Sequence, residues 1–454
     1  MLGSLVYRLH PVWAQELILA AKSAVRNRMR EGRAFDAMTA QLRESEWWPE
    51  SRLREFQRRE LHRVIGAALR DVPYYRDRYR RLAAESDHAD VLKLLERLPI
   101  IGKNEVREAG RALISERKRG PLFAGSTSGT TGAPLSLYQD LHAITRENAF
   151  IWRQLAWAGM RRGDRRAWIR GDMIVPAGQR HPPFWRLNRA ENMLMLSSYH
   201  LSDRAARAYV EALGRFDPVV IQAYPSSIAF LAGWMLGARA QYHGRALRGI
   251  VTSSETLSEN QRRDIERAFG CRVFDWYGQF ERVAAIGTCE RGGRHLITDY
   301  SYVELLPADE GLCEIVGTGF NNLSMPLIRY RCGDRVRPAP AGRRCACGRS
   351  FPLIEEVLGR VDDSIKLPDG RSVGRLDHLF KGVEGILEAQ IRQDRLDAVT
   401  LLIVAAPTYT DRTRDVLKSN ARHRLGNGIE LDIRLVDAIP RTRNGKFKGV
   451  VCNV

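Results

Sequence analysis

A run of glycine, serine and threonine is the feature of the sequence best suited to chemistry. It extends over residues 125–132 and precedes a strand-like segment at residues 135–138. Glycine lets backbone N–H groups approach an anion closely, and small hydroxyl side chains add neutral hydrogen-bond donors. The run therefore favours a phosphate-binding loop, although a flexible linker has the same composition. It is not a Walker A loop, because no Lys-Ser or Lys-Thr pair follows its last glycine.

Three cysteines and a histidine form a second set of residues suited to chemistry. His295 follows Cys289 by six residues, and a single residue separates Cys345 from Cys347. Three thiolates and one imidazole are a ligand set for tetrahedral zinc, and four protein ligands make such a site structural rather than catalytic. Glycines nearby would supply the tight turns of a metal knuckle. The alternatives are buried free thiols, or a site in which Cys332 replaces one ligand.

Carboxylates and one lysine occur in three short motifs after the glycine-rich run. Glu281 ends the segment Trp-Tyr-Gly-Gln-Phe-Glu, where its oxygen could hold a cation that bridges phosphates. Asp334 ends the segment Tyr-Arg-Cys-Gly-Asp, and its two oxygens can accept hydrogen bonds from two hydroxyl groups. Lys446 lies in the segment Pro-Arg-Thr-Arg-Asn-Gly-Lys-Phe-Lys. The chain has nine lysines against 63 arginines, which argues against a random basic tail at this place.

These motifs, in this order, resemble those of the adenylate-forming superfamily, which contains acyl-CoA synthetases, the adenylation domains of peptide synthetases and luciferases. The resemblance extends from about residue 60 to residue 448. It is greatest to the phenylacetate-CoA ligase branch, including relatives encoded with capsular polysaccharide genes. Segments similar to that branch lie at residues 72–75, 224–226, 253–255 and 345–349.

The resemblance implies a role for each matching residue. Lys446 would be catalytic, since its ammonium would neutralise the charge shared by an attacking carboxylate and the α-phosphate. Glu281 would also be catalytic and would bind Mg2+ on ATP, and Asp362 would be the hinge between a large and a small domain. The residues implied to bind ATP or AMP are Ser126, Thr127, Ser128, Gly129, Thr130, Thr131, Gly132, Ser254, Glu255, Tyr277, Gly278, Asp334 and Arg360.

Two positions depart from the usual pattern of the superfamily. Ala133 stands where the phosphate loop usually has lysine, and Phe280 stands where the second motif usually has threonine. Both lie where the carboxylate and the α-phosphate would meet. The loop would therefore depend on backbone and hydroxyl donors for its contacts with phosphate.

The type of secondary structure that the sequence predicts around these residues differs between parts of the chain. Residues 1–118 form helical patterns, residues 119–300 alternate short apolar strands with helices, and residues 300–360 form short strands separated by turns. From residue 360 the pattern restarts as a compact α+β module. The prediction is an α/β protein with the adenylate-forming enzyme fold. A large N-terminal multi-layer α/β domain at residues 1–359 would include a small antiparallel sheet, and a small mobile α+β lid domain would occupy residues 360–454.

Four segments carry more detailed predictions. The uncharged stretch at residues 219–238 predicts a strand, a turn and a helix from residue 228, because a proline and polar residues interrupt it as a membrane span. Residues 327–330 predict a strand, and residues 411–425 predict a helix. Residues 1–24 predict an amphipathic helix that packs on the protein, since charged residues interrupt the apolar run that a signal peptide needs.

The composition limits the class of protein. A chain of 454 residues that is 44% hydrophobic and 28% charged is typical of a globular enzyme. Seven cysteines predict reduced thiols in a cytoplasmic protein rather than a disulfide framework. The net charge of +19 favours anionic partners, but the basic residues are dispersed and form no known nucleic-acid module. We expect no nucleic-acid partner and no transmembrane segment, and the sequence carries no information on oligomeric state.

The expected function is ATP-dependent activation of a small carboxylic acid through an acyl-adenylate, followed by transfer to the thiol of CoA. The expected cofactors are ATP, Mg2+, CoA as acceptor and a structural Zn2+. One alternative is adenylyl or acyl transfer to a hydroxyl or amine acceptor in polysaccharide or secondary metabolism. Another is a non-catalytic basic protein that binds nucleic acid or a membrane surface. The sequence does not identify the acid.

Overall fold

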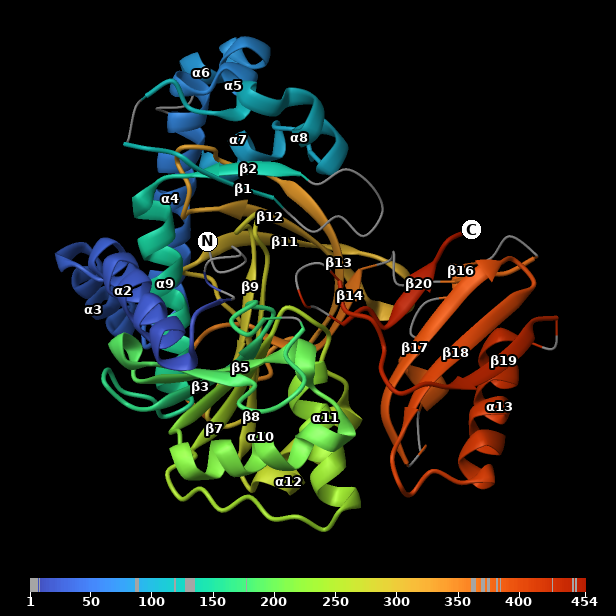
Figure 1. Ribbon diagram of the computed structural model, residues 1–454. Helices are drawn as coiled ribbons and strands as arrows, with labels where there is room; N and C mark the ends of the chain where they lie inside the picture. Colours follow the sequence, from blue (N-terminus) through green and yellow to red (C-terminus); the bar gives the residue numbers. More distant parts are fainter. Residues whose placement is uncertain are drawn as a thin grey trace. The chain divides into compact units, whose positions relative to one another are not determined.

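The computed structural model describes residues 7, 9–85, 90–117, 120–126, 135–176, 178–360, 365–368, 372–373, 376–380, 383, 385–426, 428–442, 445 and 447–454. The chain forms two compact units. The first consists of Met1–Ala24, Ala158–Asp275 and Val361–Val454, and the second of Val25–Trp157 and Trp276–Arg360. Helices and strands occur in both units (Figure 1), and the predicted α/β class is confirmed.

In the first unit, residues 158–275 contain a mainly parallel sheet. The strand order is β4-β5-β3-β6-β7. All neighbours are parallel except β4, which is antiparallel to β5. The strands are β3 (Arg166–Arg170), β4 (Trp185–Asn188), β5 (Met193–Ser197), β6 (Val220–Ala223) and β7 (Gly249–Ser253). The α-helices that alternate with them, as predicted, are α10 (Asp203–Phe216), α11 (Pro225–Gly237) and α12 (Glu259–Phe269). Two short 3-10 helices are η2 (Arg189–Glu191) and η3 (Ser198–His200).

The stretch at residues 219–238 forms a strand, a turn and a helix, as predicted, but the helix begins earlier. Helix α11 starts at Pro225 rather than at residue 228. Proline suits the first helical position because its fixed φ is already helical and its missing N–H would have no partner there. Ile228 and Leu231 of this helix are fully buried in the core of the first unit.

The C-terminal part of the first unit is a four-stranded sheet with one helix. The order is β19-β18-β17-β20, with an antiparallel centre and a parallel strand on each side. Its elements are β15 (Ile365–Lys366), β16 (Ser372–Val373), η5 (Leu376–Phe380), β17 (Ile386–Arg395), β18 (Ala398–Ala405), α13 (Asp411–Leu425), β19 (Glu430–Leu435) and β20 (Val450–Cys452). Helix α13 has the predicted bounds. The central strand β17 was not predicted, because its Glu, Ala and Gln residues favour helix in isolation.

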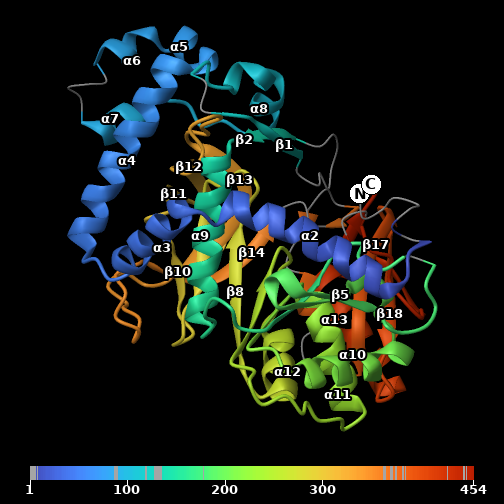
Figure 2. The ribbon, with the colours of Figure 1, turned by 60° about the vertical axis from the view of Figure 1, so that its left-hand side comes forward.

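Most of the helices belong to the second unit, as the helical patterns in residues 1–118 predicted. Helix α2 (Val12–Arg30) begins in the first unit and ends in the second. Helices α5, α6 and α7 pack against the long helix α4 (Figure 2). The other helices are α3 (Arg33–Ser45), α4 (Glu50–Asp71), α5 (Pro73–Arg78), α6 (Arg80–Glu85), α7 (Val91–Glu96), α8 (Lys103–Ala109), η1 (Gly110–Leu113), α9 (Leu141–Trp157) and η4 (Asp309–Gly311).

Antiparallel strands form the sheet of the second unit, in the order β11-β12-β13-β14-β10-β9-β8. The strands are β8 (Arg272–Gly278), which begins in the first unit, β9 (Ala285–Thr288), β10 (Arg294–Leu296), β11 (Ser301–Pro307), β12 (Cys313–Gly319), β13 (Tyr330–Pro338) and β14 (Leu353–Arg360). The strand predicted at residues 327–330 is wrong except for its last residue, because β13 begins at Tyr330. Arg329 has a φ of +49°, which breaks an extended run.

A buried ion pair holds two helices of the second unit to its sheet. Arg153 on α9 makes two bonds to Asp299, at 2.6 and 3.0 Å, and the hydroxyl of Ser45 on α3 donates to the same carboxylate at 2.5 Å. The side chains of Arg153 and Asp299 are only 4% and 1% exposed. Each charge therefore depends on the other for its solvation.

We predict that Arg153→Met lowers the free energy of unfolding by about 3–5 kcal/mol, because it leaves a buried carboxylate without its cation. Denaturant unfolding measures the change. The matched control is Arg165→Met, since the pair between Arg165 and Asp217 is 3.5 Å long and its side chains are 45% and 25% exposed. That control should cost about 1 kcal/mol or less. Similar losses in the two variants would contradict the prediction.

Candidate active site and metal centre

The predicted phosphate loop is carried by a β-hairpin of the second unit. Strands β1 (Phe123–Ser126) and β2 (Ser136–Gln139) pair antiparallel, with Ser126 opposite Ser136. The two ends of the loop therefore lie side by side. The predicted residues Thr127, Ser128, Gly129, Thr130, Thr131 and Gly132, and Ala133 with them, lie outside the described residues.

Phe280 lies against the backbone of this hairpin. A Cβ atom built on Gly125 would overlap the ring of Phe280, so only glycine leaves room for the aromatic side chain. The side chain of Gln139 donates a hydrogen bond to the carbonyl of Phe280 at 3.4 Å. The departure from threonine at this position is thus accommodated by the hairpin that carries the loop.

The structure brings together Tyr277 and Asp334, two of the residues implied to bind ATP. The Tyr277 hydroxyl donates to Oδ2 of Asp334 at 2.7 Å, and Gln279 donates to the same oxygen at 3.3 Å. Burial raises the pKa of Tyr277 well above its usual value, so the phenol remains a donor. Gln279 was not predicted as a site residue. It directly follows Gly278, the exposed last residue of β8, and this place in the sequence was the available signal.

The carboxylate of Glu281 lies in the same part of the second unit. The Tyr330 hydroxyl, at the start of β13, donates to Oε1 of Glu281 at 3.3 Å. This bond orients a half-buried carboxylate, whose oxygens are the ligand type that Mg2+ requires. Arg360 ends β14 opposite Asp334 in the strand pairing, and Asp362 lies outside the described residues.

In the first unit, the C-terminal motif is held at both sides of Lys446. The backbone N–H of Phe447 donates to Oε1 of Glu255 at 2.6 Å. Gly445 has a φ of +69° and lies so close to Gly171 and Tyr199 that a Cβ atom could not be added. Lys446 itself lies outside the described residues.

Glu255 joins this motif to helix α11. Its other oxygen, Oε2, accepts the backbone N–H of Ser226 at 3.0 Å, in the first turn of the helix. Burial raises the pKa of Glu255, while its hydrogen bonds to Ser226 and Phe447 oppose the rise. A carboxylate that accepts two backbone N–H groups is a strong connection between distant segments.

Arg170 lies beside the predicted residue Ser254 and was not predicted. Its Nη2 donates to the Ser254 hydroxyl at 2.5 Å, and the guanidinium lies 5.0 Å from the ring centre of Trp168 and 4.9 Å from that of Tyr224. Burial lowers the pKa of Arg170. No ion pair joins this guanidinium to a carboxylate within the part of the chain that the structure describes. In a chain of 63 arginines, the sequence offered no signal that would single it out.

The carboxylates near Arg170 are bound to other donors. Asp172 accepts the indole N–H of Trp168 at 2.6 Å, and Glu255 accepts the two backbone N–H groups described above. The cation at the end of β3 is therefore held between aromatic rings and a hydroxyl group. Such a site can receive an anionic group of a ligand.

The four predicted metal ligands converge in the second unit. The ligand atoms of Cys289, His295, Cys345 and Cys347 all lie within 4.8 Å of one another. Cys289 follows β9, His295 lies on β10, and the other two cysteines lie between β13 and β14. Cys332 is not a member of this group and lies 3.8 Å from the Tyr277 hydroxyl instead. All seven cysteines are free thiols.

Distances within the group fit a tetrahedral ion. The sulfur atoms of Cys289 and Cys345 are 3.6 Å apart, and Cys347 Sγ is 3.3 Å from His295 Nε2. Two sulfur atoms bound tetrahedrally to zinc at about 2.3 Å are about 3.8 Å apart. His295 Nδ1 lies 3.1 Å from the Phe351 carbonyl, which can only accept, so the other ring nitrogen is the one left for a metal. Burial lowers the pKa of His295 and favours the neutral imidazole that binds zinc.

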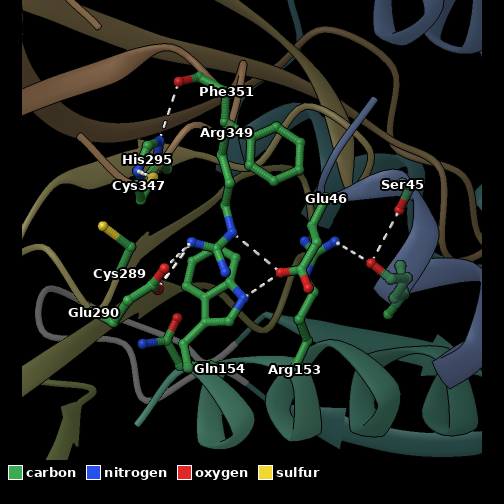
Figure 3. Close-up of polar contacts among 12 residues, drawn as sticks. Ser45, Glu46, Arg153, Gln154, Cys289, Glu290, His295, Cys347, Arg349 and Phe351 are labelled. Atoms are coloured by element: carbon green, nitrogen blue, oxygen red, sulfur yellow. Dashed lines mark hydrogen bonds and ion pairs between the residues drawn. The ribbon is translucent and has the colours of Figure 1, made fainter. Parts of the chain in front are cut away.

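Arg349 ties the cysteine group to two helices (Figure 3). It makes two bonds of 2.8 Å to Glu290, the residue after Cys289, and one of 3.1 Å to Glu46. Its guanidinium also lies 4.3 Å from the ring centre of Trp157, at the end of α9. Sequence analysis missed this residue, although its position two residues after Cys347 was a signal.

Comparisons with known proteins agree with the resemblance of the motifs. A family model described as the CapK C-terminal domain matches residues 367–453. Protein CapK of Staphylococcus aureus is 24% identical over 456 residues, which cover 99% of each chain. A phenylacetate-coenzyme A ligase of Thermus thermophilus is 24% identical over 447 residues, which cover 90% of this chain and 98% of the relative.

A solved structure shows the same fold. It is a crystal structure of 2-hydroxyisobutyryl-CoA ligase in the postadenylation state, in complex with R3-HIB-AMP. It superposes with a TM-score of 0.67 at 19% identity and covers 90% of this chain and 91% of that chain. The chain is thus similar over most of its length to protein CapK and to a phenylacetate-CoA ligase, in agreement with the resemblance of its motifs, and it has the fold of the adenylate-forming CoA ligases.

Proposed function

We propose that this protein is an AMP-forming ligase that activates a carboxylic acid with ATP and passes the acyl group to the thiol of CoA. The observation that carries the proposal is the attachment of the C-terminal motif to Glu255, a residue that the resemblance implies to bind ATP or AMP. The similarity to phenylacetate-coenzyme A ligases supports both the acid and the CoA acceptor.

In the first step, a carboxylate oxygen of the acid attacks the α-phosphorus of ATP and pyrophosphate leaves. Lys446 would neutralise the negative charge shared by the carboxylate and the α-phosphate in the transition state. The loop from Ser126 to Gly132 would bind phosphate oxygens, Asp334 would accept the ribose hydroxyl groups, and Glu281 would hold Mg2+ on the phosphates. The acyl-adenylate must be kept from water because it hydrolyses readily.

In the second step, the sulfur of CoA attacks the acyl carbon and AMP leaves. A turn of the C-terminal domain, residues 360–454, about Asp362 would remove Lys446 and admit the thiol. In this proposal the contact between Phe447 and Glu255 belongs to the adenylation step and must break before thioester formation.

Lys446→Ala should lower acid-dependent ATP–pyrophosphate exchange by about 100-fold or more, because it removes the cation that stabilises the transition state. The exchange is measured on purified protein with a panel of carboxylic acids. The matched control is Lys448→Ala in the same motif, which should retain exchange. Full activity of the Lys446 variant would contradict the assignment. ATP binding without exchange for any acid would favour transfer to a hydroxyl or amine acceptor instead.

We also propose that Arg170 binds an anionic group of the acid substrate. Replacement by Gln should lower kcat/KM for the acid by about 10- to 100-fold, because it removes one charge-assisted hydrogen bond to the substrate. The KM for ATP should change little. Arg170→Lys keeps the charge and should recover part of the loss. A rise in both KM values with no recovery in the lysine variant would indicate a structural role.

The Cys289, His295, Cys345 and Cys347 group is proposed to hold one structural Zn2+, which would join the β9–β10 hairpin to the turn before β14. Cys345→Ser should remove the ion and lower the free energy of unfolding by several kcal/mol, because metal binding contributes to folding. Elemental analysis and denaturant unfolding measure both effects. The control is Cys313→Ser, a free cysteine outside the group. A metal-free, fully stable wild type would contradict the assignment.

A further inference from the structure

A cavity in the second unit is lined mainly by basic side chains. Its volume is about 440 Å3, within the range of about 300–1,000 Å3 that is usual for small-molecule sites. Arg63 and Arg70 reach it from α4, Arg117 from the segment after η1, and His142 from the first turn of α9. Arg63 and Arg70 lie on one face of α4, two helical turns apart. Among the described residues that line the cavity, Asp140 is the single acid.

The carboxylates in and beside the cavity already have partners. Asp140 accepts the backbone N–H of Ala143 at 2.7 Å through Oδ1 and the hydroxyl of Ser324 at 2.6 Å through Oδ2. Glu60, on α4, accepts two bonds from Arg63, at 2.5 and 3.0 Å. Both acids therefore hold the wall of the cavity together.

The charges of Arg70 and Arg117 are not balanced in this way. No ion pair joins either guanidinium to a carboxylate within the ranges that the structure describes. Glu116, which precedes Arg117, is bound to Arg76 at 2.6 Å instead. Guanidinium groups with free donors at the wall of a cavity suit the oxygens of an anion.

Arg146 adds a further cation on α9, next to this wall. Burial lowers the pKa of its guanidinium, although Arg146 has no ion pair among the residues described. The acids whose charges act on it, Glu60 and Asp299, are bound to Arg63 and Arg153. A cation that has lost water without gaining a partner is costly, so an anion in the cavity would offset part of this cost.

The cavity is separate from the predicted phosphate loop. The loop precedes β2, whereas Asp140 directly follows this strand, so the length of the strand, about 13 Å, lies between them. Planar guanidinium groups bind phosphate through two parallel hydrogen bonds. We propose that the cavity binds a phosphate group of a second small ligand through Arg63, Arg70 and Arg117. Free pyrophosphate and the 3'-phosphate of CoA both offer this chemistry.

Isothermal titration of the full chain with pyrophosphate tests the proposal. A saturating nonhydrolysable ATP analogue is present, so that the phosphate loop is occupied. We expect binding that weakens as salt is raised. Arg70→Gln with Arg117→Gln should weaken it by at least about 10-fold, because charge-assisted hydrogen bonds are lost. Lysine at both positions keeps the charges and should recover part of the loss.

The matched control is Arg54→Gln, a change at a residue that is 72% exposed and lies on the opposite side of α4 from Arg63. This variant should bind pyrophosphate as the wild type does. The affinity for ATP should stay unchanged in every variant, because the loop lies elsewhere. The unfolding midpoint should stay unchanged as well, since Arg70 and Arg117 are exposed.

Titration with CoA and with dephospho-CoA distinguishes the two sources of phosphate. Tighter binding of CoA, by a factor that the double variant abolishes, would assign the cavity to the 3'-phosphate. Equal binding of the two, with pyrophosphate still bound, would assign it to free pyrophosphate. Neither result depends on CoA being the acceptor in the proposed reaction. Binding of pyrophosphate and CoA that the double variant leaves intact, or no binding of either, would overturn the proposal. Loss of ATP affinity in the double variant would also overturn it, because the arginines would then belong to the nucleotide site.

Discussion

The carboxylate of Glu255 is the connection on which the proposed chemistry depends. One oxygen accepts the backbone N–H of Ser226 at the start of α11, and the other accepts that of Phe447 in the C-terminal motif. Two segments more than 200 residues apart are thus joined at one half-buried carboxylate, whose desolvation these hydrogen bonds partly offset. The motif meets Gly171 and Tyr199 through Gly445, where only glycine has room. Both neighbours of Lys446 in the sequence, Gly445 and Phe447, are therefore fixed by contacts within the first unit.

The second unit depends in a comparable way on buried cations. Arg153 holds α3 and α9 to Asp299. Arg349 binds Glu46 and Glu290, and its guanidinium lies over two tryptophan rings. The cysteine and histidine group lies at the end of this network. Guanidinium groups suit such sites because they are planar, weakly hydrated and able to bind carboxylates with two parallel bonds. The abundance of arginine in the chain therefore has a structural component as well as an electrostatic one.

Local sequence patterns predicted part of the fold and the cysteine and histidine group. The bounds of α13 and the convergence of Cys289, His295, Cys345 and Cys347 were predicted from residue types and spacing. Strand β17 was missed because its residues favour a helix unless tertiary partners override them. Arg170 was missed because it differs from the other arginines only in its contacts with a hydroxyl group and two aromatic rings, which form when the chain folds. A packed helix was predicted over residues 1–24, whereas α2 spans Val12–Arg30. The face that packs was not predicted, because Gln15 and Ser23 find their partners some 170 residues away.

The proposed function requires that a carboxylate oxygen attacks the α-phosphorus of ATP. An acid labelled with 18O in its carboxylate tests this step directly when it is incubated with the enzyme, ATP, Mg2+ and CoA. We predict that the AMP released carries one 18O atom, because the attacking oxygen stays on phosphorus when the thiol takes the acyl group. Mass spectrometry of the AMP gives the answer. Thioester formation with unlabelled AMP, or with ADP and phosphate as the nucleotide products, would contradict the account.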